Sequence, residues 1–404
     1  MTGEPPLEQL LDRYAEVLIA IGLNVQPGHR PVLSGPLESA QLLRRCAGAC
    51  YRAGALDVHV IYSDAELARE RHLHARPEVF GQQPQWWADA LARTSEEGSP
   101  FLSLVGEDAL ALASFDAERV AADRRARDVA FRRFRAFSSS NAIPWCVAGA
   151  ATPAWASRAF PDLPLEQGVD RLWRDLAAMT RASGRRDPRA AWDEHIAQLA
   201  VRCELLNVKR FNSLRFSGPG TDLTVGLAEG HRWIGGSEIA ADGTSFVANM
   251  PTEEIFSAPD PHRVDGIVTL TRTAAISSQP VGGVTLRFER GVVVEARAEQ
   301  GQAVLDGLLE SDPGARRLGE VALVPASTRV PSDRLYYEAL IDENAASHIA
   351  LGDSYPPCLP DGSTAGNSSA VHEDVMIGSS QIRVDGVRHD GTAEAIMVAG
   401  EFTI

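Results

Sequence analysis

Lysine is almost absent from this sequence of 404 residues. Lys209 is the one lysine among 39 basic residues, so arginine carries nearly all of the positive charge. A Walker-type phosphate-binding loop requires a Gly-Lys pair, whereas Lys209 follows Val208. The segment Gly218-Pro219-Gly220 begins like a dinucleotide fingerprint, but Leu223 stands where the third glycine is required. The sequence therefore contains neither of these nucleotide-binding motifs.

The sequence also lacks an excess of positive charge and a long apolar run. Its formal net charge of -15 and pI near 5.2 would repel a phosphate backbone or an anionic lipid surface. Near the N-terminus, Glu4, Glu8 and Asp12 precede a short apolar stretch at 17–21, which is not the pattern of a signal peptide. We expect no nucleic-acid partner, no membrane partner and no membrane-spanning segment.

Cysteine is scarce and irregularly placed. The five cysteines are Cys46, Cys50, Cys146, Cys203 and Cys358. An odd number of widely scattered cysteines does not indicate a disulfide framework. Cys46 and Cys50 stand one helical turn apart, and we interpret them as small buried residues. With the missing signal peptide, this usage predicts a reducing, cytoplasmic location.

The hydrophobic pattern of the first half is typical of an α/β fold. Strand-like segments at 31–33 and 57–62 flank a helix expected at about 37–54, an order that predicts a right-handed βαβ unit on a parallel sheet. Further helices are expected at 86–94, 115–135, 167–182 and 188–206, with strands at 101–105 and 143–147. We therefore predict an α/β N-terminal domain at residues 1–205.

The pattern changes after residue 210 to short strands separated by turns. The strand candidates are 211–216, 223–227, 266–276, 284–288, 292–296, 320–324, 348–351, 371–377, 381–384 and 395–402. The turns Glu289-Arg290-Gly291 and Asp385-Gly386 are expected to join strands into hairpins. Short helices are expected near 302–310 and 333–344. The second half predicts a mostly antiparallel β (α+β) C-terminal domain at residues 206–404, which carries the candidate metal site.

His372 and Asp374 stand two residues apart in an apolar segment. On a strand this spacing places both side chains on one face, where they would reach the same metal ion. For an isolated pair, the exposed face of an edge strand is the alternative interpretation. Other ligand-type residues, however, stand in apolar or turn-like settings before this pair, namely Glu253, Glu254, Glu320 and His348.

Together these residues provide carboxylates and imidazoles in a number that suits two metal ions. Adjacent side chains in an extended segment point opposite ways, so at most one of Glu253 and Glu254 would face a given metal. Three carboxylates and two imidazoles exceed the three protein ligands usual for one catalytic zinc, and they suit two divalent ions that share a carboxylate. Such ligands accept Zn, Co, Mn or Mg, so the pattern leaves the identity of the metal open.

A combination of motifs in the second half resembles one known family. These motifs are 218–227, 231–233, 251–254, 318–325, 342–345, 348–352, Tyr355-Pro356 and the His372/Asp374 segment. In them the sequence is similar to the thermophilic aminopeptidases, the aminopeptidase T and aminopeptidase S group called peptidase family M29. The first half matches more loosely, through 24–28 and 205–207.

The resemblance implies roles for individual residues. The implied metal ligands are Glu254, Glu320, His348, His372 and Asp374. Tyr355 matches the active-site tyrosine of the family, and Glu253 is the neighbouring carboxylate, with a role as a base or as support for the ligands. The implied activity is that of a metallo-aminopeptidase, which hydrolyses N-terminal residues from short peptides through a water activated by two divalent ions. The implied assembly is a homodimer.

Two other functions stay open at this point. Ring-cleaving dihydroxypyridine dioxygenases resemble the same family but hold one iron through two histidines and an aspartate, and the presence of both Glu254 and Glu320 argues against them. A specialised amidohydrolase or a non-catalytic binding protein on the same scaffold is the other alternative. Metal content would separate them, since two divalent ions favour hydrolysis, one oxidisable iron favours oxygenation, and none favours binding.

Overall fold

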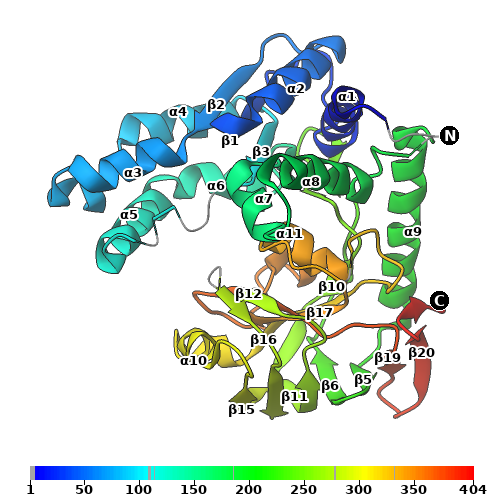
Figure 1. Cartoon of the computed structure of the whole chain (residues 1–404). Coiled ribbons are helices and arrows are strands. Elements are labelled where there is room, and N and C mark those ends of the chain that lie inside the picture. The colour runs from blue at the N-terminus through cyan, green and yellow to red at the C-terminus, as the bar shows by residue number, and fades with distance from the viewer. Residues whose placement is uncertain (1–4, 108–110, 113, 185, 277–278, 332) are drawn as a thin grey trace. The chain divides into compact units, whose positions relative to one another are not determined.

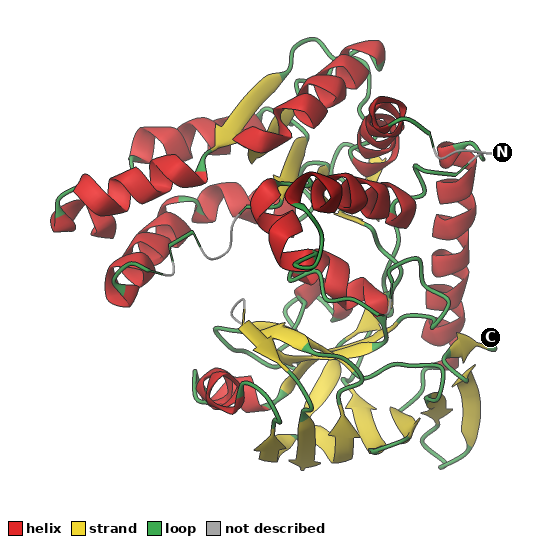
Figure 2. Cartoon of the chain, viewed as in Figure 1, coloured by secondary structure: helices red, strands yellow, loops and turns green. Residues whose placement is uncertain are grey.

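The computed structural model describes residues 5–107, 111–112, 114–184, 186–276, 279–331 and 333–404 (Figure 1). The described chain divides into two compact units. The first unit contains the residues up to Asp193 together with Ser237–Pro251, and the second contains Glu194–Gly236 together with Thr252–Ile404. Strands are most numerous in the second unit, as Figure 2 shows.

A parallel sheet organises the first unit. Its strand order is β2-β1-β3-β4-β9, and the strands are β1 Val32–Pro36, β2 His59–Ser63, β3 Phe101–Val105, β4 Trp145–Gly149 and β9 Asn249–Met250. Val32 pairs with His59 on one side and with Phe101 on the other. The parallel pairing of β1 and β2 around a helix confirms the predicted βαβ unit. Two short strands, β7 Glu238–Ile239 and β8 Ser245–Phe246, pair separately.

Helices make up much of the first unit. They are α1 Leu7–Val17, α2 Ala40–Arg52, α3 Ala65–His74, α4 Gln85–Glu96, α5 Ala117–Ala130, α6 Arg132–Ser139, α7 Pro153–Ala159 and α8 Leu165–Met179; α9 Pro188–Lys209 continues into the second unit. On α2, Leu42, Leu43, Cys46 and Cys50 recur at helical spacing and are buried. Burial raises the pKa of the Cys50 thiol to about 12. All five cysteines are buried, as was expected for Cys46 and Cys50.

Antiparallel sheets form most of the second unit, so the fold class expected from the sequence is confirmed. An eight-stranded sheet has the order β15-β14-β11-β6-β5-β19-β20-β21 and a four-stranded sheet the order β10-β16-β17-β18. The strands are β5 Ser213–Gly218, β6 Thr221–Leu227, β10 Ile255–Ser257, β11 Pro259–Thr269, β12 Ala274–Ile276, β13 Gln279–Val281, β14 Thr285–Glu289, β15 Val292–Arg297, β16 Leu318–Leu323, β17 His348–Gly352, β18 His372–Met376, β19 Arg383–Val387, β20 Ala393–Val398 and β21 Glu401–Phe402. The helices α10 Gln302–Leu309 and α11 Ala339–Asp342 match the two expected short helices in position.

One of the two predicted hairpin turns is wrong. The turn at Glu289-Arg290-Gly291 joins β14 to β15 as expected. Asp385 and Gly386, however, lie inside β19, and the chain turns later, where Arg388 N donates to Thr392 O. A Cβ on Gly386 would approach the ring of Phe211 to 2.5 Å, so this glycine permits close packing of a ring on the strand.

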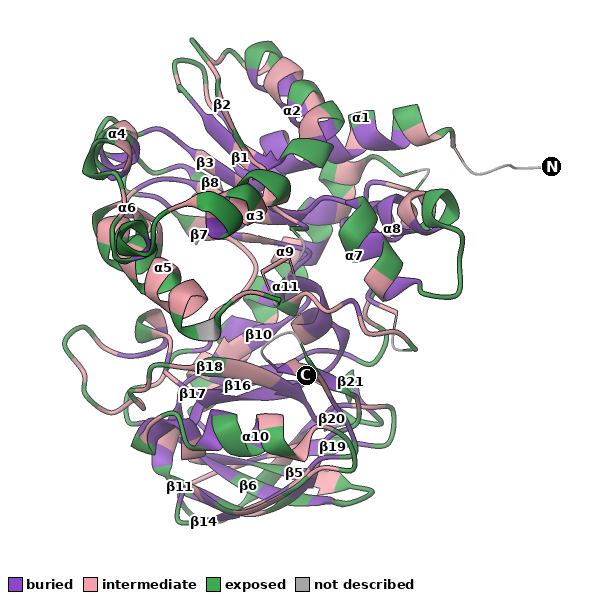
Figure 3. Cartoon of the chain, turned by 60° about the vertical axis from the view of Figure 1, so that its left-hand side comes forward, coloured by how far each residue is buried: buried purple, intermediate pink, exposed green. Residues whose placement is uncertain are grey.

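The four-stranded sheet has one apolar face and one polar face. Ile255, Val321, Leu323, Ile349, Leu351 and Val375 alternate along its strands and belong to the hydrophobic core. The inner strands β16 and β17 are buried throughout (Figure 3). The residues between these core positions therefore face away from the core and include the candidate ligands. Within the described residues, none of the helices is long and apolar enough to cross a membrane.

Candidate metal site

The register of the four-stranded sheet brings four candidate ligands onto one face. Ala350 of β17 pairs with Glu320 of β16 on one side and with Asp374 of β18 on the other. His348 stands two residues before Ala350 on the same strand. Residues directly opposite each other, and residues two apart on a strand, project to the same face. The fourth candidate ligand, His372, pairs with Gly352 in the same ladder. Alanine and glycine at these intervening positions leave space between the longer side chains.

A β-bulge at Gly319 sets the direction of Glu320. Leu318 pairs with Leu351 and Glu320 pairs with Ala350, so Gly319 is an extra residue on β16. Bulges of this kind re-aim the neighbouring side chain. A Cβ at position 319 would lie 2.0 Å from the carbonyl oxygen of Asp353, so a side chain here would collide with the adjacent main chain. Only glycine fits this position without movement of that segment.

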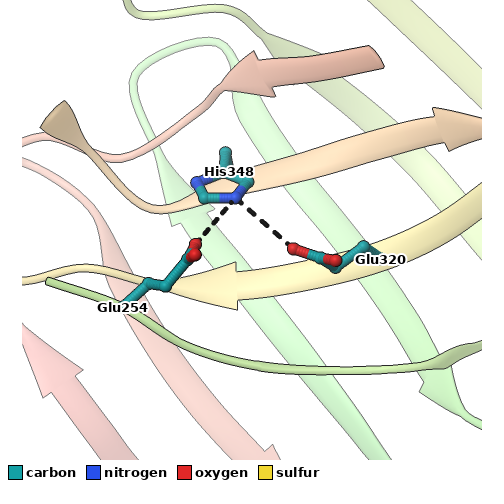
Figure 4. A group of neighbouring side chains, drawn as sticks. All are labelled: Glu254, Glu320 and His348. Atoms are coloured by element: carbon teal, nitrogen blue, oxygen red, sulfur yellow. Dashed lines mark ion pairs between the residues drawn. The ribbon is translucent and has the colours of Figure 1, made fainter. Parts of the chain in front are cut away.

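One group of ligand atoms gathers around His348 (Figure 4). Nε2 of His348 lies 3.2 Å from Oε2 of Glu254 and 3.6 Å from Oε1 of Glu320. Glu254 comes from the segment just before β10, Glu320 from β16 and His348 from β17. Each of the three residues offers a ligand atom within 4.8 Å of the other two. We call this group the first triad.

A second group of ligand atoms gathers around His372. Nε2 of His372 lies 3.5 Å from Oδ1 of Asp374 and 3.9 Å from Oε2 of Glu320. These three residues also offer ligand atoms within 4.8 Å of one another. We call this group the second triad. Because Glu320 belongs to both triads through different oxygens, it is placed to bridge two ions.

Both histidines are oriented by main-chain carbonyl groups. Nδ1 of His348 lies 3.1 Å from Ala346 O, and Nδ1 of His372 lies 2.8 Å from Asp353 O. A carbonyl oxygen only accepts, so Nδ1 carries the hydrogen in each ring and Nε2 of the neutral ring presents its lone pair to the carboxylates. Metal-binding histidines in proteins commonly have this arrangement.

Without a bound cation, the site holds protons. Burial opposes charge on His348, but the carboxylates of Glu254 and Glu320 outweigh this effect and raise its pKa well above the usual value. Burial likewise opposes charge on His372, yet Asp374 raises its pKa to about 9. Burial raises the pKa of Glu320, and repulsion from Asp374 and Glu254 adds to the rise. A divalent cation would satisfy the same carboxylates.

Two buried carboxylate oxygens in the triads indicate that a cation would fit this site. Oε2 of Glu254 and Oδ1 of Asp374 are buried and accept no hydrogen bond from the described residues. Both oxygens lie close to Nε2 of His348, at 3.2 Å and 3.7 Å. Buried oxygens without hydrogen-bond donors are costly, and an ion is one of the partners that can compensate them. The potential ligand atoms of the two triads are carboxylate oxygens and imidazole nitrogens, which suit a divalent metal ion.

The two adjacent glutamates have different surroundings. Glu254 lies in the first triad, whereas Oε2 of Glu253 lies 3.8 Å from Nε2 of His195 on α9. Both side chains are buried. The structure thus separates the two carboxylates as expected for an extended segment, and Glu253 lies in neither triad.

Tyr355 also lies outside the two triads. It precedes a short 3₁₀ turn at Pro356–Cys358 and is partly buried. The centroid of its ring is 5.7 Å from that of Phe256. Phe256 pairs with Ala322, which pairs in turn with His348, so its side chain shares the polar face of the sheet. The phenol is therefore on the side of the sheet where the candidate ligands lie.

Sequence reasoning gave no role to Glu343, whose carboxyl group is influenced by the charges of the candidate ligands. Burial raises the pKa of Glu343 well above the usual value, and repulsion from Glu254 and Asp374 contributes. Its Oε1 accepts a hydrogen bond from Nδ2 of Asn344 at 3.3 Å. The available signal was its position between Asp342 and Asn344, just before the strand that His348 opens.

Comparison with known proteins supports this interpretation of the chain. The family model described as thermophilic metalloprotease (M29) matches residues 7–402. Aminopeptidase T of Thermus thermophilus is 42% identical over 402 residues, with 98% of each chain covered. Aminopeptidase 2 of Geobacillus stearothermophilus is 38% identical over 405 residues, also with 98% of each chain covered.

A solved structure is similar over the same extent. The wild-type AmpT structure from Thermus thermophilus matches with a TM-score of 0.93 and 40% sequence identity, covering 99% of this chain and 100% of that one. The similarity in fold and in sequence thus extends over both units. The chain belongs to the thermophilic metalloprotease family M29 and is a metal-dependent hydrolase.

Proposed function

We propose that this metalloprotease is an aminopeptidase that removes N-terminal residues from short peptides with two divalent ions. The observation that carries the proposal is the pair of triads that share Glu320. A shared carboxylate is the arrangement expected when two ions act on one substrate. The names of the relatives, aminopeptidase T and aminopeptidase 2, support the choice of reaction.

The proposed ligands divide between the two ions. Glu254, Glu320 and His348 would hold one ion, and Glu320, His372 and Asp374 would hold the other. When bound, the pair would supply an activated water and polarise the scissile carbonyl group. The ions are Zn, Co, Mn or Mg, since carboxylate and imidazole ligands accept all four. His348 is almost fully buried, whereas 37% of the His372 side chain is exposed, so we place substrate entry near His372.

The remaining chemistry is assigned to side chains outside the triads. Glu253 would accept the proton of the attacking water and return it to the leaving amine. Tyr355 would donate its hydroxyl hydrogen to the oxyanion of the tetrahedral intermediate. The free α-amino group of the substrate would bind one of the ions or an acidic residue of the site.

The proposal is tested by metal content and substrate preference together. The chain is stripped with a chelator, reloaded with each of the four ions, and assayed on a panel of aminoacyl amides and short peptides. We expect two ions per chain and cleavage of substrates with a free α-amino group, with little cleavage of N-acetylated counterparts. A chain that holds one oxidisable iron and opens dihydroxylated rings would contradict the proposal, as would a chain that binds no metal.

The proposal includes a cytoplasmic homodimer. The five cysteines, all of them buried, fit a reducing compartment. Sedimentation of the metal-loaded chain tests the assembly, and a mass of one chain at micromolar concentration would contradict it.

A further inference from the structure

One peptide group beside the triads has both of its polar atoms bonded to buried side chains. The group joins Thr252 to Glu253. Its carbonyl oxygen lies 2.7 Å from Nε2 of His195, and its N–H donates to Oδ1 of Asn344 at 2.6 Å. His195 lies on α9, far from residue 252 in sequence, and Asn344 lies in the turn before β17. Both side chains are buried.

This contact matters because the peptide group lies outside the sheet. The ladder between β10 and β16 begins at the pair Ile255 and Leu323, so Thr252, Glu253 and Glu254 precede it. All three residues are buried, and a buried main-chain group needs a partner to offset its lost hydration. Rotation of the 252–253 peptide plane would swing the carboxylates of both glutamates. Those are the proposed base and one of the proposed ligands.

The chemistry of each contact fixes its direction. A carbonyl oxygen only accepts, so His195 carries a hydrogen on Nε2. The amide of Asn344 is oriented by a second contact, since its Nδ2 donates to Leu340 O at 2.9 Å, which leaves Oδ1 for Glu253. A reversed amide would place an NH₂ group against an N–H group. His195 and Asn344 thus hold the peptide from opposite polar ends.

We infer that His195 and Asn344 are positioning residues, which clamp the Thr252–Glu253 peptide and thereby hold Glu254 in the first triad and Glu253 beside His195. The effect on metal binding rests on Glu254 as a proposed ligand of the first triad. The effect on turnover rests on the proposed aminopeptidase function.

Two substitutions of similar chemistry test the clamp at His195. In His195→Gln the side-chain amide nitrogen reaches the position of Nε2, whereas in His195→Asn it falls one methylene short. Both replacements are polar and smaller than the ring, so both chains are expected to fold. Thermal unfolding of the metal-free proteins checks this point. The probe is Co²⁺, whose affinity is measured by chelator competition and whose visible spectrum reports the coordination geometry.

We expect His195→Gln to bind Co²⁺ nearly as the unmodified chain does. His195→Asn should bind it about 10- to 100-fold more weakly, the cost typical of losing a group that orients a ligand, and with an altered spectrum. Equal Co²⁺ affinity and equal spectra in the two variants would overturn the inference, whether both match the unmodified chain or both are impaired.

The same experiment separates the clamp from the proposed function. If the unmodified chain binds Co²⁺ but cleaves no aminoacyl amide, the aminopeptidase proposal fails and the Co²⁺ comparison still decides the clamp. If the unmodified chain is active, turnover of the loaded variants should follow the order of their Co²⁺ affinities.

Discussion

At the scale of single residues, Glu320 carries the greatest weight because both triads contain it. We expect Glu320→Gln to reduce Co²⁺ or Zn²⁺ binding to below one ion per chain and to lower turnover by more than about 100-fold, beyond the loss typical of a supporting group. The amide keeps the shape of the side chain but lacks the charge that attracts two cations. Metal analysis and an aminoacyl-amide assay measure the two effects.

Glu373 offers a matched control for this substitution. It lies between His372 and Asp374, pairs with Leu351 and therefore points to the opposite face of the sheet. We expect Glu373→Gln to keep both ions and most of the activity. Equal losses in Glu320→Gln and Glu373→Gln would show a general effect of acidic charge in place of a role as ligand.

Tyr355 is expected to act on the rate and not on the metals. Removal of one oxyanion donor typically lowers turnover by about 10²- to 10³-fold, and we expect Tyr355→Phe to show a loss in this range with unchanged metal content. Steady-state kinetics of fully loaded enzyme measure the effect. The exposed Tyr62 of the first unit provides a Tyr→Phe control. Reduced metal content with normal turnover of the loaded fraction would make the phenol structural.

The pKa of His372 predicts how metal affinity depends on pH. In the metal-free chain this pKa is about 9, since Asp374 outweighs burial, so an ion that binds the second triad at pH 7 displaces a proton. Affinity should therefore rise about tenfold per pH unit between pH 7 and 9 for each proton released. Titrations at several pH values test this slope, and a flat profile would contradict it.

The stability of the metal-free chain should fall as the pH rises, whereas metal affinity increases. His372 has a higher pKa when folded than the unfolded value of about 6.5, so its charge stabilises the fold fully below pH 6.5. This contribution is lost as the pH rises toward 9.

At the scale of elements, the bulge in β16 positions this strand relative to the other strands that carry candidate ligands, β17 and β18. A Cβ at Gly319 would collide with Asp353 O, and the same oxygen accepts the hydrogen bond of His372 Nδ1. We expect Gly319→Ala to destabilise the fold by about 1–3 kcal/mol, as overpacking does, and to weaken metal binding at the second triad. Thermal unfolding and Co²⁺ titration measure these effects.

Gly307 on α10 is the control for this prediction. A Cβ at position 307 meets nothing within 4 Å, and helix propensity favours alanine there by about 0.5–1 kcal/mol. Gly307→Ala should therefore stabilise the chain slightly and leave metal binding unchanged. Equal Co²⁺ affinity in the Gly319 and Gly307 variants would show that the bulge does not influence metal binding.

The sequence predicted elements whose signals are local. The period-two spacing of His372 and Asp374 was enough to expect a common face, and the strand at β18 has that face. The sequence pattern could not predict the bulge at Gly319 or the contact between Glu253 and His195, because both depend on segments far away in sequence. At Gly386 a local signal was misleading. The Asp-Gly pair predicted a turn, but this glycine lies within β19 and packs closely against the ring of Phe211.

At the scale of the whole molecule, every proposed ligand belongs to the second unit. Metal should therefore stabilise this unit by about 2.7 kcal/mol for each site at a hundredfold excess over Kd. We expect hydrogen exchange to slow in β16, β17 and β18 on addition of metal, with little change in β1 and β3. Exchange with mass-spectrometric detection measures this difference. Equal protection in both units would contradict a site confined to the second.

The carbonyl acceptors of the two histidines have a consequence for neutral drift. The oxygens of Ala346 and Asp353 belong to the main chain, so a codon change at either position does not delete the acceptor. Ring orientation therefore leaves no signature in the residue types at 346 and 353, and both positions are open to substitution as far as this contact is concerned. Lineages that lose the site are expected to do so through the proposed ligands themselves or through residues such as Gly319, which leaves room for the carbonyl group of Asp353.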